Sequence, residues 1–255
     1  MAVDEAILIH HSKGDVPPTI RFYGWDPPAV STGYFQDLQR EIDLDACRRL
    51  GVGWVRRVTG GRAILHDQEV TYSVVASEDE FLVSGSVLQS YLKISRCLLE
   101  GLRILGINAT MSTGRKSDHS SAACFDAPSR YELVVDNRKL IGSAQTRKYG
   151  CILQHGSIPI HLNVDKLFSV LKFTNEKLRE RLQRDFARKA ISLSEAGGRS
   201  YGYGEVVRAL SRGFAGTFKI VLEEGTLTEE EEETARILMR DKYGTEKWNF
   251  DRKSS

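Results

Sequence analysis

The sequence lacks the segments that insert a chain into a membrane or export it. Its 255 residues contain no continuous apolar run of about 18 residues, the length that a membrane-spanning helix needs. The N-terminal stretch MAVDEAILIHHSKGD has no basic start followed by a long apolar core and a small-residue cleavage site. We therefore expect a cytoplasmic protein with no membrane partner.

Cysteine is also scarce. The four cysteines, Cys47, Cys97, Cys124 and Cys151, lie far apart without a C-x-x-C pair, so we expect reduced thiols and no disulfide framework. To hold zinc, Cys151 and His155 would need two more ligands at a matching spacing, and none stands out. The sequence predicts neither a metal nor a cofactor.

Charge of one sign is not in excess. The 36 basic and 34 acidic side chains give a net charge of +2, so the overall basic field of nucleic-acid-binding proteins is missing. Hydrophobic residues make up 41% of the chain and aromatic residues 9%, which is enough for a substantial core. No segment stands out as a linker between domains, and this predicts one domain over residues 1–255.

The first third of the chain alternates helical and strand-like patterns. Asp26, Pro27 and Pro28 separate the first two apolar strand patterns, which predicts a hairpin near the start. The predicted helices cover 2–13 and 43–51, and the predicted strands cover 19–25, 29–35, 52–61 and 63–77.

The middle of the chain predicts a long helix followed by a sheet. Apolar residues recur at helical spacing over 86–105, as in an amphipathic helix with one buried stripe. The polar stretch 108–121 has no periodicity and predicts a mobile surface loop, a common form of lid. Asp136 and Asn137 between two apolar runs predict a hairpin turn, and 151–160 supplies a further strand.

The last third is mostly helical. Thr228 and Glu231 form a capping-box pattern that starts a final helix. The other predicted elements are helices over 163–173, 175–190 and 203–218 and a short strand over 219–224.

The stretch RRVTGGRAILHDQEVTYSVV, residues 56–75, contains charged residues and a glycine pair that a plain core strand does not need. Gly60 and Gly61 permit a sharp turn or a close approach of the backbone to a ligand, at an entropic cost that ordinary strands avoid. Three arginines, a histidine and two carboxylates share the segment with these glycines. The pattern predicts a pocket wall.

Cys124 and Lys139 are the main candidates for chemistry. Cys124 follows the polar stretch and precedes a strand, which favours exposure. A turn at Asp136 and Asn137 brings Lys139 back beside the strand that follows Cys124, and a neighbouring cation lowers the pKa of a thiol. We expect Lys139 to be partly exposed and easily replaced. Two alternatives stay open, Cys124 as a small packing residue and Lys139 as a solvated turn residue.

The nearby histidines and serine give weaker indications. His66 and His155 lie on predicted strands, where a histidine is more often a hydrogen-bonded structural residue than a catalyst, so we interpret both as wall residues. Ser143 has no G-x-S-x-G pattern around it, which disfavours a serine hydrolase. Gly60 and Gly61 match neither a Walker loop nor a dinucleotide fingerprint.

Several segments together resemble one known family. RRVTGGRAILHDQEVTYSVV, YELVVDNRKLIGSAQTRKYGCILQHGSI and the early VDEAIL are similar to the lipoate-protein ligase and octanoyltransferase superfamily, whose catalytic domain is related to biotin protein ligase. ACFDAPSRYELVV resembles the Gram-positive-type branch, octanoyl-[acyl-carrier-protein]:protein N-octanoyltransferase. In that branch a cysteine at the position of Cys124 holds the acyl group. The resemblance spans most of the chain.

The resemblance implies a fold and a pocket. It implies an α/β (α+β) fold, in which a mixed β-sheet flanked by helices holds the acyl chain in a tunnel. Cys124 and Lys139 would be catalytic, and the glycine segment would bring backbone N–H groups close to the acyl carbonyl. With the strand residue His155 added, the implied lining consists of Arg57, Gly60, Gly61, His66, Gly142, Ser143, Ala144 and His155.

The resemblance also implies a two-step acyl transfer. Cys124 would take the octanoyl group from octanoyl-acyl-carrier protein and pass it to a lysine of the glycine cleavage H protein or of a 2-oxoacid dehydrogenase lipoyl domain. A thioester donor needs no ATP, and the chain ends about where ligases of this family usually continue into an accessory domain. Family members also carry about twenty residues before the first helix, including a strand, so we expect that either the start of this sequence is misassigned or a sheet edge is uncovered here.

Three alternatives to this function stay open. Two are enzymes, an ATP-dependent lipoate or octanoate ligase and an amidotransferase that moves octanoyl groups between lipoyl domains. The third is a catalytically silent acyl-binding or carrier-binding module, which would not need Cys124 and Lys139 together.

Overall fold

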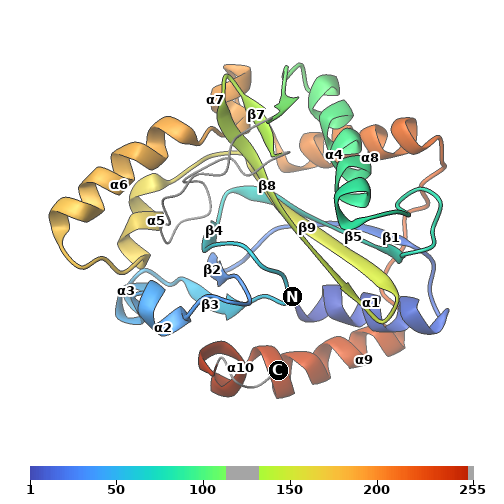
Figure 1. The fold of residues 1–255 in the computed structure, drawn as a ribbon, viewed down its shortest axis with the longest axis horizontal. Helices are drawn as coiled ribbons and strands as arrows, with labels where there is room; N and C mark the ends of the chain where they lie inside the picture. Colours follow the sequence, from blue (N-terminus) through green and yellow to red (C-terminus); the bar gives the residue numbers. More distant parts are fainter. Residues whose placement is uncertain (113–131, 252–255) are drawn as a thin grey trace.

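Two β-sheets organise the part of the chain that the computed structural model describes, residues 1–112 and 132–251 (Figure 1). Its strands are β1 (Thr19–Tyr23), β2 (Ala29–Thr32), β3 (Gly53–Arg56), β4 (Ile64–His66), β5 (Glu69–Ser77), β6 (Thr110–Met111), β7 (Leu133–Val135), β8 (Arg138–Lys148) and β9 (Cys151–Pro159). Within these residues the larger sheet has the order β1-β5-β9-β8-β7-β6 with antiparallel neighbours. The smaller sheet has the order β3-β2-β4, with β2 parallel to β3 and antiparallel to β4.

The predicted hairpin of residues 19–35 is wrong, because its two strands belong to different sheets. β1 pairs with β5 at the edge of the larger sheet, and its residues are half-buried. β2 is buried throughout and pairs on both sides, with β3 and with β4. A buried strand needs partners for both of its rows of backbone groups, and a hairpin supplies only one. For the same reason β3 and β4 flank β2, and the glycine segment between them crosses over it.

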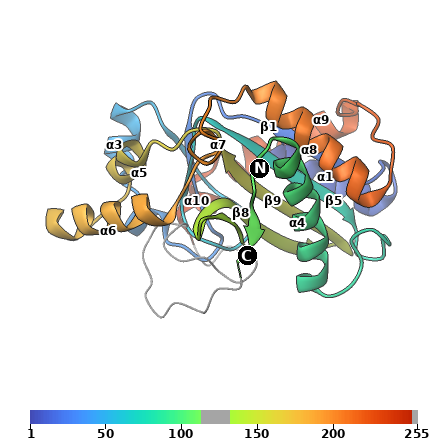
Figure 2. The ribbon, with the colours of Figure 1, turned by 90° about the horizontal axis from the view of Figure 1, so that it is seen from above.

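Two helices that pack against each other, α4 (Val87–Ile104) and α8 (Tyr203–Phe218), cover one face of the larger sheet (Figure 2). α4 confirms the predicted long helix and begins at a capping box on Ser86. The helices approach each other at two glycines: a Cβ on Gly213 would lie 2.5 Å from the backbone nitrogen of Gly101. The main hydrophobic core lies between these helices and the sheet.

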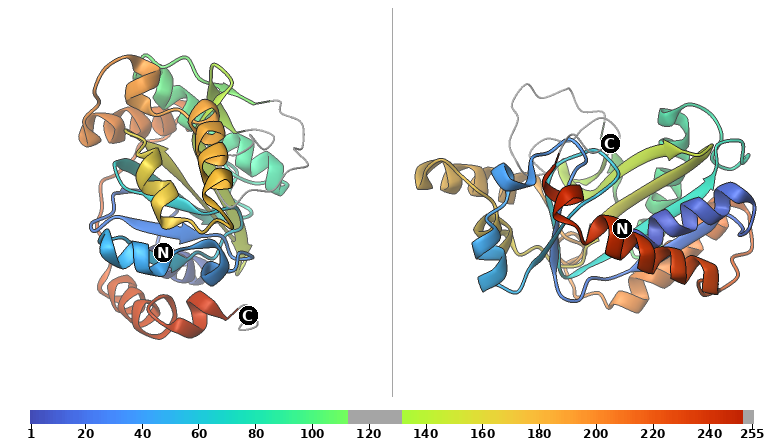
Figure 3. Two further views of the ribbon diagram at one scale, coloured as in Figure 1. Left: turned by 90° about the vertical axis from the view of Figure 1, so that its left-hand side faces the viewer. Right: turned by 90° about the horizontal axis from the view of Figure 1, so that it is seen from below.

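The opposite face of the larger sheet carries α1 (Ala2–Lys13), which confirms the first predicted helix. The C-terminal segment packs along α1 (Figure 3). It consists of α9 (Glu229–Leu238), the π-helix η1 (Met239–Tyr243) and α10 (Glu246–Phe250). The predicted capping box is confirmed at the start of α9. Lys242 of η1 donates to the carboxylate of Glu5 on α1, at 2.6 and 2.8 Å from its two oxygens.

A second hydrophobic cluster lies under the smaller sheet and the remaining helices except α7 (Leu193–Gly197), whose Leu193 belongs to the main core. It includes Val30 of the central strand β2 and Phe186 of the long helix α6. The remaining helices are α2 (Leu38–Glu41), α3 (Leu44–Arg49), α5 (Val164–Val170), α6 (Glu176–Lys189) and α7 (Leu193–Gly197).

Three further predictions concern turns and loops, and the structure confirms one of them. The hairpin at Asp136 and Asn137 is confirmed, and both residues have positive φ, 49° and 60°, as a tight turn of this kind requires. The strand predicted over 219–224 is wrong: Lys219 ends α8 in a left-handed conformation, and Val221 after it is 89% exposed. The stretch 108–121 is not wholly a loop, since β6 pairs with β7; its residues from 113 onward lie outside the described part.

None of the helices in residues 1–112 and 132–251 combines the length and the apolar character needed to cross a membrane.

Candidate active site

Strand register brings three predicted lining residues onto one face of the larger sheet. Ala144 of β8 lies directly opposite His155 of β9, and Gly142 lies opposite Ser157. Directly opposed residues of antiparallel strands share a face, so Gly142, Ala144 and His155 face the same side. On this face β8 therefore presents only small groups, those of Gly142 and Ala144.

Ser143 does not share this face. It alternates with its neighbours along the strand, and its hydroxyl accepts a hydrogen bond of 2.7 Å from Tyr72, which belongs to the main core. Burial raises the pKa of Tyr72 to about 12. Gly156 lies opposite Ser143, and a Cβ there would be 2.5 Å from the Tyr72 ring. Ser143 therefore supports the sheet from the core side.

The predicted glycine segment folds into a tight loop. Arg57 is buried, and its guanidinium donates to the carbonyl oxygens of Gly60 and Arg62, at 2.9 Å each. Gly61 has a φ of +99°, which side chains other than glycine rarely adopt. The loop lies so close to Gly33 that a Cβ there would be 2.0 Å from the carbonyl oxygen of Gly61. Gly33 is thus part of the loop's support.

Gly33→Ala should therefore displace the glycine loop. The clash involves backbone, which cannot turn away as a flexible side chain can, and we expect a loss of about 1–3 kcal/mol in the free energy of unfolding. Denaturant unfolding measures this loss. Gly216→Ala is the control, because a Cβ at this exposed position of α8 meets no atom within 4 Å. Equal stability of the two variants would contradict the packing described for Gly33.

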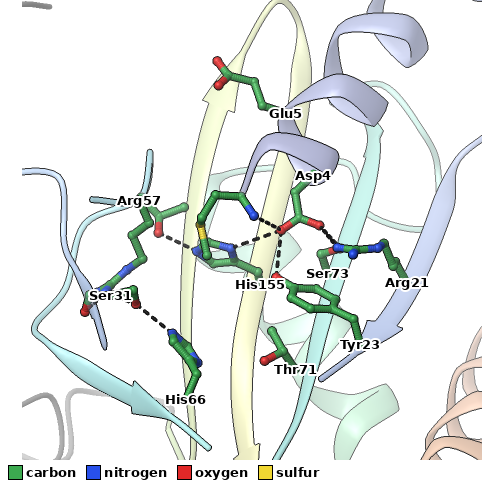
Figure 4. A network of polar contacts seen from close by, with 12 residues as sticks. Asp4, Glu5, Arg21, Tyr23, Ser31, Arg57, His66, Thr71, Ser73 and His155 are labelled. Atoms are coloured by element: carbon green, nitrogen blue, oxygen red, sulfur yellow. Dashed lines mark hydrogen bonds and ion pairs between the residues drawn. The ribbon is translucent and has the colours of Figure 1, made fainter. Parts of the chain in front are cut away.

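His155 links the glycine loop to α1 (Figure 4). Its Nε2 lies 2.6 Å from the Thr59 hydroxyl. Its Nδ1 faces the carboxylate of Asp4 at 3.9 Å, which is beyond a direct hydrogen bond. Burial lowers the pKa of His155, and the charge of Asp4 opposes this shift. The imidazole is therefore neutral near pH 7 and fixes the loop at Thr59.

Asp4 is a buried charge that anchors the first turn of α1. It accepts hydrogen bonds from Arg21 at 2.8 Å and from Tyr23 at 2.9 Å, both on β1 (Figure 4). Burial by itself raises the pKa of Asp4, but nearby positive groups, the amino group of Met1 first among them, outweigh it. The pKa therefore lies well below its usual range. The carboxylate stays charged and faces His155.

His66 has different partners on the same side of the molecule. Its Nε2 lies 2.8 Å from the Ser31 hydroxyl, and its Nδ1 lies 2.8 Å from the carboxylate of Glu69. The ring of Trp25 stacks on it at a centroid distance of 4.3 Å. Arg57 donates to Ser31 at 3.1 Å, so the support of His66 is continuous with the glycine loop.

Lys139 is buried, and the expectation of a partly exposed, easily replaced lysine is wrong. Its side chain is 1% exposed and forms an ion pair with Glu132. The chain after α6 covers this end of the hairpin: the Ile191 N–H donates to the Lys139 carbonyl oxygen at 3.0 Å, and Ala190 forms a bridge with Lys139. Removing the lysine would leave a buried carboxylate without its partner, which is destabilising.

A cleft of about 1020 Å³ opens beside the glycine loop. Its walls include Gly60 of the loop and Thr146 of β8, two residues beyond Ala144 on the same strand. Lys242 and Trp248 of the C-terminal segment line it as well. Its volume is at the upper end of the range of about 300–1,000 Å³ usual for ligand pockets, so an extended ligand would fit.

Cys124 lies outside the described residues. The described cysteines, Cys47, Cys97 and Cys151, are buried and free. Burial raises the pKa of the Cys47 thiol to about 11 and of the Cys97 thiol to about 12, and it also raises the pKa of Cys151. These thiols stay protonated near pH 7 and are poor nucleophiles. Across 1–112 and 132–251, no group of three or more His, Cys, Asp or Glu residues is placed to hold a metal ion.

Comparison of the chain with known proteins identifies its family. Residues 1–215 match the model of the lipoyl protein ligase A/B catalytic domain. The octanoyltransferase LipM of Kyrpidia tusciae is 52% identical over 256 residues, which cover 98% of this chain and 93% of that protein. The octanoyltransferase LipM of Geobacillus kaustophilus is 49% identical over 259 residues, 99% of this chain and 93% of that protein. The chain belongs to the lipoyl protein ligase A/B catalytic-domain family.

Solved structures confirm the predicted fold of this lipoyl ligase family member. The bi-partite lipoate protein ligase of Thermoplasma acidophilum is 30% identical and superposes with a TM-score of 0.81 over 100% of this chain and 91% of that chain. A lipoate-protein ligase A bound with ATP is 31% identical, with a TM-score of 0.79 over 98% and 92% of the two chains. The mixed pairing expected of the fold occurs in β3-β2-β4. The LipM relatives confirm the predicted octanoyltransferase branch.

Sequence reasoning missed Asp4, Gly33, Thr59 and Glu132. Glu132 had a usable indication, a carboxylate at the start of the apolar run ELVV, where burial calls for a cationic partner. Asp4 resembles any acidic residue in a helix's first turn, and Gly33 any loop glycine. Their roles arise only when strands distant in sequence come together.

Proposed function

We propose that this member of the lipoyl ligase family transfers an octanoyl group from octanoyl-acyl-carrier protein, through an acyl-Cys124 intermediate, to one lysine of a lipoyl-accepting domain. The observation that carries the proposal is the 44–52% identity, over almost the whole chain, to relatives named octanoyltransferase. The activity is that of an acyltransferase, and octanoyl transfer belongs to lipoate biosynthesis.

The first half-reaction forms a thioester on the enzyme. The Cys124 thiolate attacks the carbonyl carbon of the donor thioester, a C–S bond to Cys124 forms, and the bond to the carrier sulfur breaks. The carrier leaves as a thiolate and takes up a proton. The Lys139 ammonium stabilises the attacking thiolate, and backbone N–H groups of the glycine loop polarise the carbonyl.

The second half-reaction forms the amide. The neutral ε-amine of the acceptor lysine attacks the acyl-cysteine carbonyl, a C–N bond forms, and the C–S bond breaks to return the Cys124 thiolate. The nitrogen releases one proton, which balances the proton taken up by the carrier. Lys139 orients the amine in this step.

The predicted lining residues divide into two groups in this proposal. Gly60, Gly142 and Ala144 border the acyl chain, because they lie beside the cleft or share the face of His155 and present little or no side chain. The other group holds the walls through the contacts described above and consists of Arg57, Gly61, His66, Ser143 and His155.

An ATP-dependent ligase is the second candidate function, because solved structures of similar fold are lipoate ligases and one of them is bound with ATP. The two candidates differ in their donors. A ligase activates a free acid and releases pyrophosphate, whereas the proposed transferase uses a thioester that is already activated.

The purified protein should octanoylate a lipoyl domain or an H protein from octanoyl-acyl-carrier protein without any nucleotide. The measurement is the mass of the acceptor over time, with and without ATP and magnesium. Modification that requires free octanoate, ATP and magnesium, with pyrophosphate released, would establish the ligase instead. Modification that occurs only from an octanoylated H protein would establish the amidotransferase.

The proposed acceptors are the glycine cleavage H protein and the lipoyl domain of a 2-oxoacid dehydrogenase. A relative of similar fold, the bi-partite ligase of Thermoplasma acidophilum, is described together with its E2 lipoyl domain, which supports an acceptor of this class. We place the reaction in the cytoplasm. The free state of Cys47, Cys97 and Cys151 fits such a reducing compartment.

A further inference from the structure

Two ion pairs with very different surroundings lie next to each other on the hairpin of β7 and β8. Arg138 pairs with Glu195 of α7 near the surface, where the side chains are 28% and 53% exposed. Lys139 pairs with Glu132 in the interior, where they are 1% and 7% exposed. Only the inner pair has lost almost all of its hydration.

Stability alone does not account for the inner pair. Desolvation costs several kcal/mol per ion, and an apolar pair of similar volume is often as stable or more so. The backbone fixes both partners: the Ser112 N–H donates to the Glu132 carbonyl oxygen at 2.7 Å, and the Ile191 N–H donates to that of Lys139 at 3.0 Å. The ammonium group is therefore held at one place in a dry part of the molecule.

We infer that Glu132 is the positioning residue for Lys139, whose ammonium group it fixes in place and keeps charged for acyl transfer. This inference rests on the proposed function and adds a residue to it. A carboxylate in contact with a lysine favours the protonated form. Lys139 forms an ion pair with Glu132, which precedes β7, whereas its neighbour Arg138 on β8 pairs with Glu195 on α7.

The role of Lys139 follows from its partner. An ammonium held by a carboxylate acts through its charge, by stabilising a thiolate or the oxygen of a tetrahedral intermediate. No proton leaves the Lys139–Glu132 pair in the first half-reaction. The carrier thiolate takes its proton from solvent.

Glu132→Gln tests this inference, because it removes the charge and keeps the shape. We expect the rate of octanoyl transfer at pH 7 to fall about tenfold or more, since Lys139 would be less well held and less fully charged. The alkaline limb of the pH–rate profile should move to lower pH, because a lysine without its carboxylate loses its proton more readily. Glu132→Asp keeps the charge but shifts it by one methylene, so its rate should fall while the limb stays in place.

Glu195→Gln is the matched control on the same hairpin and should change neither rate nor profile. A purely structural role for Glu132 would lower the melting temperature without moving the profile, so an unchanged alkaline limb in Glu132→Gln overturns the inference. If Glu132→Gln does not fold, Glu132→Asp decides, and a wild-type rate overturns the inference. The wild-type enzyme is assayed in parallel: if it transfers no octanoyl group, the proposed function itself has failed.

Discussion

Lys139→Met should abolish octanoyl transfer and lower stability, whereas Lys139→Met combined with Glu132→Leu should regain stability and stay inactive. Breaking a buried ion pair by removing one partner costs about 3–5 kcal/mol, while replacing both partners by apolar groups is about neutral. The cation is missing from both variants, so we expect transfer to fall about a hundredfold or more in each. Thermal unfolding and the initial rate of transfer measure the two effects separately.

Arg138→Ala is the control for this pair of variants. Arg138 lies beside Lys139 but pairs with the half-exposed Glu195, and such surface pairs contribute about 0–1 kcal/mol. Its stability and transfer rate should stay near those of the wild type. A stable double variant that still transfers octanoate at the wild-type rate would show that Lys139 serves only folding.

Cys124→Ala should abolish transfer from octanoyl-acyl-carrier protein, and Cys124→Ser should reduce it by orders of magnitude. Alanine has no nucleophile, and a serine hydroxyl is far less acidic than a thiol, so neither variant can present an anionic attacking group at neutral pH. The measurement is the initial rate of acceptor octanoylation at saturating donor. Both variants should keep the melting temperature near that of the wild type if the role of Cys124 is chemical.

Cys151→Ser is the matched control for the cysteine variants. Burial holds the Cys151 thiol protonated, so its replacement should leave the transfer rate close to the wild-type value. A Cys124→Ala variant that transfers normally would leave Cys124 as a small packing residue, the alternative that the sequence keeps open.

Local patterns in the sequence predicted the elements whose causes are local. The capping box and apolar stripe of α4 lie within one segment, as do Thr228 and Glu231 at the start of α9. The turn at Asp136 and Asn137 depends on two residues that tolerate positive φ. These features need no distant partner, and each was predictable at the correct position.

Tertiary pairing decided what the sequence could not predict. The strand over 29–32 looks like half of a hairpin, but its complete burial requires partners on both edges, which come from β3 and β4. Alternation along β8 separates Ser143 from Gly142 and Ala144, and only the register with β9 shows which face is which. The resemblance to a family supplied the set of residues but not these orientations.

The sequence predicted which residues belong to the candidate site, but not the contacts that hold them in place. Lys139 was expected at the surface because it follows a turn, and the chain at Ala190 and Ile191 that covers it is about fifty residues away in sequence. The role of Glu132 as the partner of Lys139 became clear only from the burial of both side chains. The same holds for Asp4, whose carboxylate faces His155 across α1 and β9.

The most direct test of the central claim is the mass of the protein after mixing with octanoyl-acyl-carrier protein in the absence of an acceptor. A thioester in a site that excludes water hydrolyses slowly near neutral pH, so the acyl-enzyme should accumulate. The account predicts one added octanoyl group, located by digestion on the peptide that contains Cys124, removed by hydroxylamine and discharged when the lipoyl acceptor is added. An unlabelled protein that nevertheless transfers octanoate, or a label on Cys97 or Cys151, would contradict it.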